Sequence, residues 1–254
     1  PQKIGDVYNL SMDTARRNQE GIAHVLPVLQ EIENVTDKAQ WPEVLGKAMD
    51  FGLWAMYVDA DAMNSSMNIL NEYQAGFALS QKDYYIDEDE HTKHIREEYV
   101  KHVEKMFELF GQENAAEKAQ TVLRLETRLA NAALSNVELR DPVANYNKMS
   151  VEELQTLVPQ VDWEVYFAGL NIAPDSLSVG QVRHLQEAGK MLAEESLEDM
   201  KTLFTWQVID GSADFLTEEI FMQNFEFYGR ILSGRQEPTP LWKRAVAMVN
   251  GTLG

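Results

Sequence analysis

The amino-acid sequence predicts a mainly α fold, a multi-helix lobe with at most a small β element. Apolar residues recur with helical period along most of the chain. Helix-start signals, such as a proline in the first turn or a run of acidic residues, precede several of these stretches. No segment of about 20–50 residues repeats along the sequence, so a solenoid is not supported. We therefore expect residues 1–254 to form a single helical lobe.

Two helices are expected at the start of the chain. The first covers 2–21 and ends at Gly21, which suits the position after a helix. The second covers 41–58, with Pro42 in its first turn. The apolar face of the first carries Ile4, Val7, Tyr8 and Met12. The broader apolar stripe of the second carries Val44, Leu45, Ala48, Met49, Leu53, Trp54 and Met56.

A strand and a helical hairpin are expected next. Residues 67–79 alternate partly and lack the helical pattern, which favours a strand. Residues 87–111 and 114–134 have long helical stripes, and the connector between them is very short. Such a connection is typical of two antiparallel helices.

A loop and further helices complete the second half. Pro142 interrupts the chain, and Ser150 with Glu153 forms a capping box that predicts a helix start. Residues 176–180 are expected to form a short strand. The remaining predicted helices cover 150–158, 163–170, 181–194, 196–211, 213–232 and 240–250.

Charge and composition exclude several classes of function. Acidic residues number 41 against 22 basic ones, which gives a net charge of −19. Such a surface repels phosphate backbones and anionic lipid, so no nucleic-acid partner is expected. The absence of cysteine removes disulfides, thiolate zinc sites and thiol nucleophiles. No apolar run reaches about 18 residues, so no membrane segment is expected.

No residue of the chain is predicted to be catalytic, cofactor-binding or metal-binding. None of the five histidines begins the His-Glu-x-x-His pattern of a zinc peptidase. His91, His94 and His102 could form a chance metal site, but a solvated helical surface is the more common explanation. Paired glutamates are interpreted as surface charge in so acidic a chain. They occupy 97–98, 152–153, 194–195 and 218–219.

An aromatic and methionine stripe near the C-terminus is denser than in an ordinary amphipathic helix. Core packing is the favoured interpretation, and a face that binds a partner or a peptide is the alternative. The stripe consists of Phe215, Phe221, Met222, Phe225 and Tyr228.

Several segments together resemble the neprilysin-type zinc endopeptidases, which include neprilysin, the endothelin-converting enzymes and bacterial oligopeptidase O. The stretch "RDPVANYNKMSVEEL" at 140–154 is similar to the Arg-x-Asp-Pro and Tyr-Asn-Lys-Met segment of that family. "GFALSQKDYYID" resembles a second family segment, with Ser80-Gln81 in place of the usual proline. "QKIGDVYNLSMDT" and "LWKRAVAMVNGTLG" resemble two more, with Ala245 at a usual cysteine position. The segments occur in the family's order along essentially the whole chain.

The resemblance implies a role for this chain within a larger enzyme. It matches the family's N-terminal helical region, and no residue here matches the zinc ligands, the general-base glutamate or the substrate strand. We expect a non-catalytic lobe that covers the chamber of a zinc endopeptidase and limits the size of its short peptide substrates. Its expected partner is the C-terminal catalytic lobe of the same polypeptide, which holds the zinc. The chain is accordingly expected to be a fragment without peptidase activity of its own.

Two further expectations follow from the resemblance. The alternative function is a stand-alone helical binding or scaffold module. An extracytoplasmic location and a bacterial origin are expected, because the family works mostly outside the cytoplasm and its vertebrate members carry disulfides that this cysteine-free chain cannot form.

The loop at 140–150 is expected to be structural. Arg140 and Asp141 are predicted to hold the turn by charge-assisted hydrogen bonds, and Tyr146 to pack beneath it. A role in lining the peptide chamber is the alternative.

Overall fold

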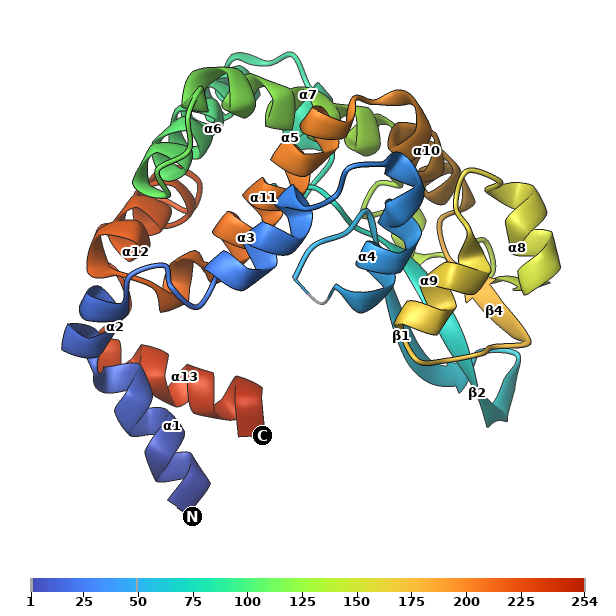
Figure 1. The fold of residues 1–254 in the computed structure, drawn as a ribbon, viewed down its shortest axis with the longest axis horizontal. Coiled ribbons are helices and arrows are strands. Elements are labelled where there is room, and N and C mark those ends of the chain that lie inside the picture. The colour runs from blue at the N-terminus through green and yellow to red at the C-terminus, as the bar shows by residue number, and fades with distance from the viewer. Residues whose placement is uncertain (1, 49, 254) are drawn as a thin grey trace.

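The computed structural model describes residues 2–48 and 50–253, and it is mainly helical with one small sheet (Figure 1). The predicted fold class is therefore confirmed. The α-helices are α1 (Gln2–Met12), α2 (Thr14–Glu20), α3 (Leu26–Glu33), α4 (Trp41–Lys47), α5 (Asp83–Ile86), α6 (Glu90–Leu109), α7 (Ala115–Ala132), α8 (Val151–Leu157), α9 (Trp163–Gly169), α10 (Val182–Glu194), α11 (Leu197–Ser212), α12 (Glu218–Asn224) and α13 (Leu241–Leu253). Single turns of 3-10 helix are η1 (Lys38–Gln40), η2 (Glu138–Arg140) and η3 (Ala213–Phe215), and η4 (Phe225–Ile231) is a π-helical segment. The strands are β1 (Trp54–Asp61), β2 (Asn64–Gln74), β3 (Asn147–Ser150) and β4 (Ser176–Val179).

The strands form one sheet in the order β1-β2-β4-β3. β1 and β2 make an antiparallel hairpin, β2 and β4 run parallel, and β3 pairs antiparallel with β4. The strand predicted at 67–79 lies largely within β2, and the one predicted at 176–180 is β4. Strands β1 and β3 were not predicted. β3 is only four residues long and its side chains are half-buried or exposed, so it carries no alternating pattern.

The helix predicted over 41–58 is wrong beyond Lys47. Ala48 already has an extended backbone, and Trp54 begins β1 instead of continuing the helix. Tertiary contacts replace the helical hydrogen bonds here, since the Gly52 N–H donates to the Gln207 side chain at 2.9 Å. The predicted apolar stripe over 41–58 therefore combined residues of helix α4 with residues of strand β1. Met49, which belonged to that stripe, lies outside the described residues.

Two other predicted helices are interrupted. The helix over 2–21 divides at Asp13, whose carboxylate accepts the Arg16 N–H at 2.9 Å and caps α2. The helix over 213–232 begins later than predicted, because Thr217 caps α12, and it then widens into η4. In both cases a short polar side chain competes for backbone donors and restarts the helix.

The α6–α7 hairpin was predicted correctly and forms one wall of the core. α7 also packs against α10 and α11, so α11 is enclosed by helices from distant parts of the chain (Figure 1). Tyr99, Phe107 and Trp206 are fully buried at this junction, and the Trp206 ring centroid lies about 6 Å from those of the other two. The capping box at the start of α8 is present as predicted.

The first and last helices, α1 and α13, lie side by side at one end of the molecule (Figure 1). α1 buries no side chain and α13 buries only that of Ala245. This helix pair therefore presents large apolar side chains to solvent. They include Ile4, Leu10, Trp242, Val246 and Leu253. Within the described residues, no helix combines the length and apolarity needed to cross a membrane.

Candidate functional site

The 140–150 loop joins elements that are far apart in sequence. Asp141 holds the turn as predicted, since its carboxylate accepts the N–H groups of Val143 and Ala144 at 2.9 and 3.0 Å. Arg140 does not, because it is exposed and its guanidinium makes no hydrogen bond or ion pair with the described residues. The prediction for this pair is therefore correct for one residue only.

Tyr146 and Lys148 reach the far end of the β1–β2 hairpin. The Tyr146 hydroxyl donates to one oxygen of Asp61 at 2.7 Å, and the Lys148 ammonium contacts the other at 2.9 Å. Asp61 is buried, and Lys148 followed by Tyr146 lowers its pKa to about 2. The loop thus fixes the hairpin to the rest of the sheet, which supports the structural interpretation.

A second polar cluster lies where the same loop meets β2 and β4. The Gln181 side chain accepts the Gln74 N–H at 2.7 Å and donates to Asn145 at 3.1 Å. Glu72 is buried beside it, and burial raises the pKa of Glu72 to about 8. One Glu72 oxygen has no hydrogen-bond partner among the described residues.

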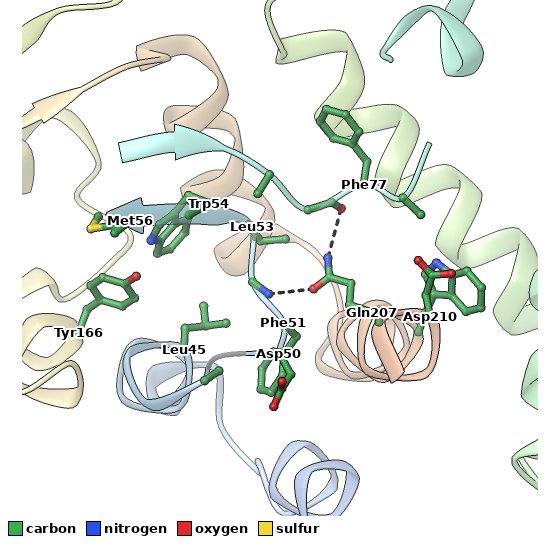
Figure 2. Close-up of a pocket in the computed structure, with 18 of the residues that line it drawn as sticks. Leu45, Asp50, Phe51, Leu53, Trp54, Met56, Phe77, Tyr166, Gln207 and Asp210 are labelled. Carbon is green, nitrogen blue, oxygen red and sulfur yellow. Dashed lines mark hydrogen bonds between the residues drawn. The ribbon is translucent and has the colours of Figure 1, made fainter. Parts of the chain in front are cut away.

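A cavity of about 390 Å³ lies between the end of α4, the start of β1, the segment after β2, α9 and α11 (Figure 2). Gln207 bridges its two sides, accepting from the Gly52 N–H and donating to the Gly76 carbonyl at 3.2 Å (Figure 2). Most of the wall is apolar. It includes Leu45, Leu53, Trp54, Phe77 and Tyr166.

Asp210 is the unusual polar group of this cavity. Burial raises its pKa to about 7, and its Oδ1 is buried without a hydrogen-bond partner in the described structure. It can therefore exchange a proton near neutral pH. The described lining holds one more carboxylate, Asp50, and no histidine, lysine or arginine. The cavity can therefore hold a small apolar group beside the Asp210 carboxyl group.

Glu126 forms the centre of a buried hydrogen-bond network. Its carboxylate accepts the hydroxyls of Tyr85 and Tyr99 at 3.0 and 2.7 Å and the Ala78 N–H at 3.1 Å. Burial raises the pKa of Glu126 to about 8, although both tyrosines oppose the rise. Tyr85 belongs to the "GFALSQKDYYID" segment, so this network gives one tyrosine of that segment a structural role.

Comparison with known proteins now places the chain. The family model described as peptidase family M13 matches residues 1–254. The chain belongs to peptidase family M13.

Relatives and solved structures agree with this M13 assignment. Endothelin-converting enzyme 1 of Cavia porcellus is 25% identical over 209 residues, which are 79% of this chain and 28% of that protein. Neprilysin-11 of Caenorhabditis elegans is 23% identical over 85% of this chain and 28% of that protein. The crystal structure of the Mycobacterium tuberculosis zinc metalloprotease Zmp1 with an inhibitor superposes with a TM-score of 0.93 at 30% identity. That superposition covers 98% of this chain and 39% of Zmp1.

A more distant structure shares the fold. PepO from Lactobacillus rhamnosis HN001 superposes with a TM-score of 0.80 at 18% identity, over 98% of this chain and 40% of that one. The M13 chain thus spans well under half of each relative, and the resemblance read from its sequence motifs is confirmed.

The histidines of this M13 chain do not form a metal site. His91 and His94 are exposed on α6, whereas His102 is buried and stacks on Phe227 with ring centroids 5.0 Å apart. The favoured interpretation of a solvated helical surface is therefore correct for His91 and His94 and wrong for His102. Among the described residues, no group of three histidine, cysteine, aspartate or glutamate side chains could hold a metal ion. The residues present here do not fit a zinc site.

The aromatic stripe of this M13 chain mainly packs in the core, as favoured. Phe221 and Phe225 are buried and Tyr228 is half-buried, while Phe215 and Met222 remain exposed. The exposed pair is too small to form a binding face by itself.

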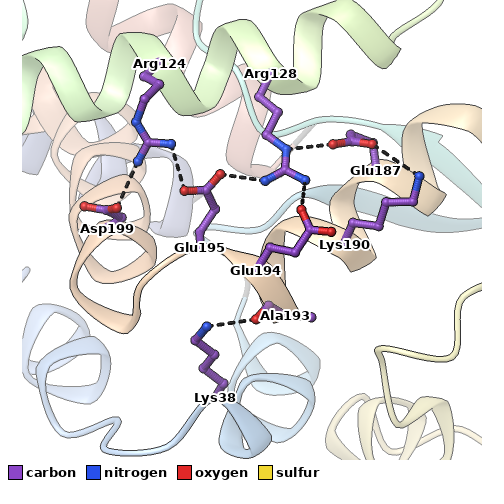
Figure 3. A network of polar contacts seen from close by, with 9 residues as sticks. All are labelled: Lys38, Arg124, Arg128, Glu187, Lys190, Ala193, Glu194, Glu195 and Asp199. Carbon is purple, nitrogen blue, oxygen red and sulfur yellow. Dashed lines mark hydrogen bonds and ion pairs between the residues drawn. The ribbon is translucent and has the colours of Figure 1, made fainter.

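One pair of glutamates has a specific role on the surface. Arg128 of α7 contacts Glu187, Glu194 and Glu195 of α10 and the turn after it, and Arg124 bridges Glu195 and Asp199 (Figure 3). These ion pairs join α7 to α10 and α11. Glu194 is thus surface charge, as predicted, whereas the Glu195 side chain is largely covered and is paired with both arginines.

A groove of about 960 Å³ opens between α1, α2, η3 and α13. We call it the arginine groove, because Arg16, Arg17 and Arg244 line it together with the apolar residues Val7, Leu10 and Met248. Sequence reasoning missed this site. Arg244 stands in a segment that carries the family resemblance and Arg16 and Arg17 follow another, yet nothing in the sequence shows that these parts of the chain meet.

The buried acids were also missed, although a signal for two of them existed. Glu126 falls in step with Val122, Leu125 and Leu129, which places a charge on the apolar face of a helix. Asp210 similarly follows Trp206 by one turn. A carboxylate at such a position indicates a buried, hydrogen-bonded acid.

Proposed function

We propose that this chain is the non-catalytic helical lobe of a zinc metalloendopeptidase that cleaves short peptides. The observation that carries the proposal is the superposition of 98% of the chain on 39% of Zmp1 with a TM-score of 0.93. Zmp1 is described as a zinc metalloprotease, and the described residues here offer no set of zinc ligands. The metal and its ligands then belong to the part of the relatives that this chain does not cover.

The role of such a lobe is steric. Residues 1–254 would form one unit that closes over the substrate chamber, positions the peptide and excludes folded proteins. Structures of Zmp1 have been solved in an open and in a partial open state, which supports a lobe that moves. This chain superposes on these two structures with TM-scores of 0.92 and 0.81. Its partners would be the catalytic lobe of the same polypeptide and short peptides.

The exposed apolar face of α1 and α13 supports this arrangement. Trp242 and Ile4 are each about half exposed and do not line the arginine groove, and both termini lie at the same end of the molecule (Figure 1). A face of this kind is usually covered by another part of a protein. The catalytic lobe is the natural cover in the proposed enzyme.

Peptide hydrolysis tests whether activity requires a zinc lobe in addition to this chain. The chain alone, with zinc added, should leave a fluorogenic peptide intact. A polypeptide that continues this chain into a zinc lobe should cut short peptides and spare folded proteins. Robust turnover by the chain alone that a chelator abolishes would contradict the proposal.

The second candidate is a stand-alone helical binding or scaffold module. The coding sequence that follows Gly254 separates the two. A His-Glu-x-x-His motif downstream supports the peptidase lobe, and a stop codon there supports the module. We also propose an extracytoplasmic location in a bacterium, which cell fractionation of the source organism would test.

A further inference from the structure

The arginine groove is a local reversal of charge in a strongly acidic chain. Three arginines line it against two acids, Glu20 and Asp214, whereas the whole chain carries −19. Both acids already have partners. Glu20 contacts Arg16 at 2.7 Å and His24 at 3.0 Å, and Asp214 accepts from the Asn224 side chain at 2.9 Å. Arg16 is therefore paired with Glu20, while Asp214 and the nearby Glu218 attract Arg244 without forming an ion pair with it in the described structure.

Arg17 and Arg244 are the unpaired cations of the groove. The Nε and Nη2 atoms of Arg17 and the Nε atom of Arg244 are buried and have no hydrogen-bond partner in the described structure. A guanidinium stays charged at any physiological pH, so it cannot relieve this burial by losing a proton. Buried N–H groups of a charged side chain are costly unless an acceptor reaches them.

The two guanidinium groups are placed to act together. The Arg244 guanidinium lies over the Phe221 ring, 3.6 Å from its centroid, so one flat face is covered and its N–H edge is left for an acceptor. Arg17 lines the same groove. Burial lowers the pKa of Arg244, Glu218 and Asp214 oppose that shift, and the charge of Arg17 adds to it. A planar carboxylate matches such an edge and can accept two N–H groups at once.

The rest of the groove favours a peptide as the carrier of that carboxylate. Val7, Leu10, Ala247 and Met248 give the walls an apolar character suited to aliphatic side chains. The chain's net charge disfavours polyanions, while a single carboxylate is attracted by the two adjacent cations. We propose that Arg17 and Arg244 form the anion-binding end of a peptide subsite that takes one carboxylate, with the apolar walls holding neighbouring residues. This inference rests on the proposed function, since it assigns a substrate class to the same lobe.

Isothermal titration calorimetry of the full chain tests the subsite. The probe is an N-acetylated peptide of about seven alanine, glycine and leucine residues, made in four forms: internal glutamate or glutamine, each with a free or an amidated C-terminus. We expect a form with one carboxylate to bind at least about tenfold more tightly than the form with none. The two single-carboxylate forms distinguish a C-terminal from a side-chain carboxylate.

Three variants locate the effect. Arg17→Gln and Arg244→Gln should reduce the preference for the carboxylate peptide to about twofold or less, because each removes part of the N–H edge. Lys243→Gln is the matched control. It changes the net charge equally and lies next to Arg244 on α13, but its side chain is exposed and does not line the groove. It should keep the preference within about twofold of the unmodified chain.

The outcomes are decisive. Equal affinity for all four peptides, no binding by the folded chain, or the same loss in all three variants would overturn the subsite. Thermal unfolding checks that each variant is folded. If Arg244→Gln does not fold, the test uses Arg17→Gln and Arg17→Lys instead. Arg17→Gln should lose the preference for the carboxylate peptide, and Arg17→Lys should restore part of it. None of these results bears on hydrolysis by a polypeptide that also carries a zinc lobe, so failure of the subsite is distinguishable from failure of the proposed function.

Discussion

The Tyr146 hydroxyl donates a 2.7 Å hydrogen bond to the carboxylate of Asp61, across 85 positions of sequence. Tyr146 lies in the segment that first indicated the family, and Asp61 ends strand β1. The segment is therefore explained by architecture, because it fixes the tip of the β1–β2 hairpin to the rest of the sheet.

Tyr146→Phe should destabilise the chain more at neutral than at acidic pH. Lys148 and Tyr146 hold the pKa of Asp61 near 2, so Asp61 contributes stability above its ordinary pKa that is lost as the pH falls towards about 2. Removing one donor reduces that contribution. Thermal unfolding should show a larger difference from the unmodified chain at about pH 6 than at about pH 3. Tyr57→Phe, an exposed tyrosine on β1, is the control, and an equal loss in both variants would contradict the prediction.

Glu126→Gln should flatten the dependence of stability on pH. The native pKa of Glu126 is raised to about 8, so its contribution is full below about 4.5 and is lost as the pH rises through 8. Glu72 and Asp210 act in the same direction, so the slope should shrink without vanishing. Urea unfolding between about pH 5 and pH 9 measures the slope of the unfolding free energy against pH. Glu117→Gln, exposed on the same helix, should leave the slope unchanged, and an unchanged slope for Glu126→Gln would refute the assignment.

Gly46→Ala should destabilise the chain by about 1–3 kcal/mol or more, because α4 and α9 meet backbone to backbone. A Cβ at Gly46 would lie 2.3 Å from the Tyr166 carbonyl oxygen, and backbone cannot yield as a flexible side chain can. Gly211→Ala is the matched control. Nothing lies within 4 Å of its Cβ position in α11, so it should stabilise by about 0.5–1 kcal/mol. Opposite signs in urea unfolding are expected, and a neutral Gly46→Ala would show that the helices can separate freely.

Arg128→Met should cost about 1–2 kcal/mol at low salt, since it leaves Glu187, Glu194 and Glu195 close together without their shared cation (Figure 3). Added sodium chloride should shrink the difference by screening the repulsion. Lys190→Met removes the same charge from a residue with one long contact, 3.7 Å to Glu187. Its effect should be within about 0.5 kcal/mol. Equal losses in the two variants would mean that net charge, not the network, sets the cost.

Local sequence signals located most of the helices. The stripes of α6 and α7 and the capping box at Ser150 depend on spacing along one segment, so they could be read without the fold. The same signals failed after Lys47. There the Gly52 N–H bonds to Gln207, more than 150 positions away, and no local pattern reports such a partner.

The sequence by itself determined the fold class and the family, because periodicity and ordered motifs are properties of the chain read in one dimension. Only the tertiary structure decided which charges matter. In a chain with 41 acidic residues, Glu126 and Asp210 are distinguished by burial, and Arg17 and Arg244 by lacking partners. Burial and pairing arise when distant segments meet, and the free energy of a charge depends on that environment more than on its neighbours in sequence.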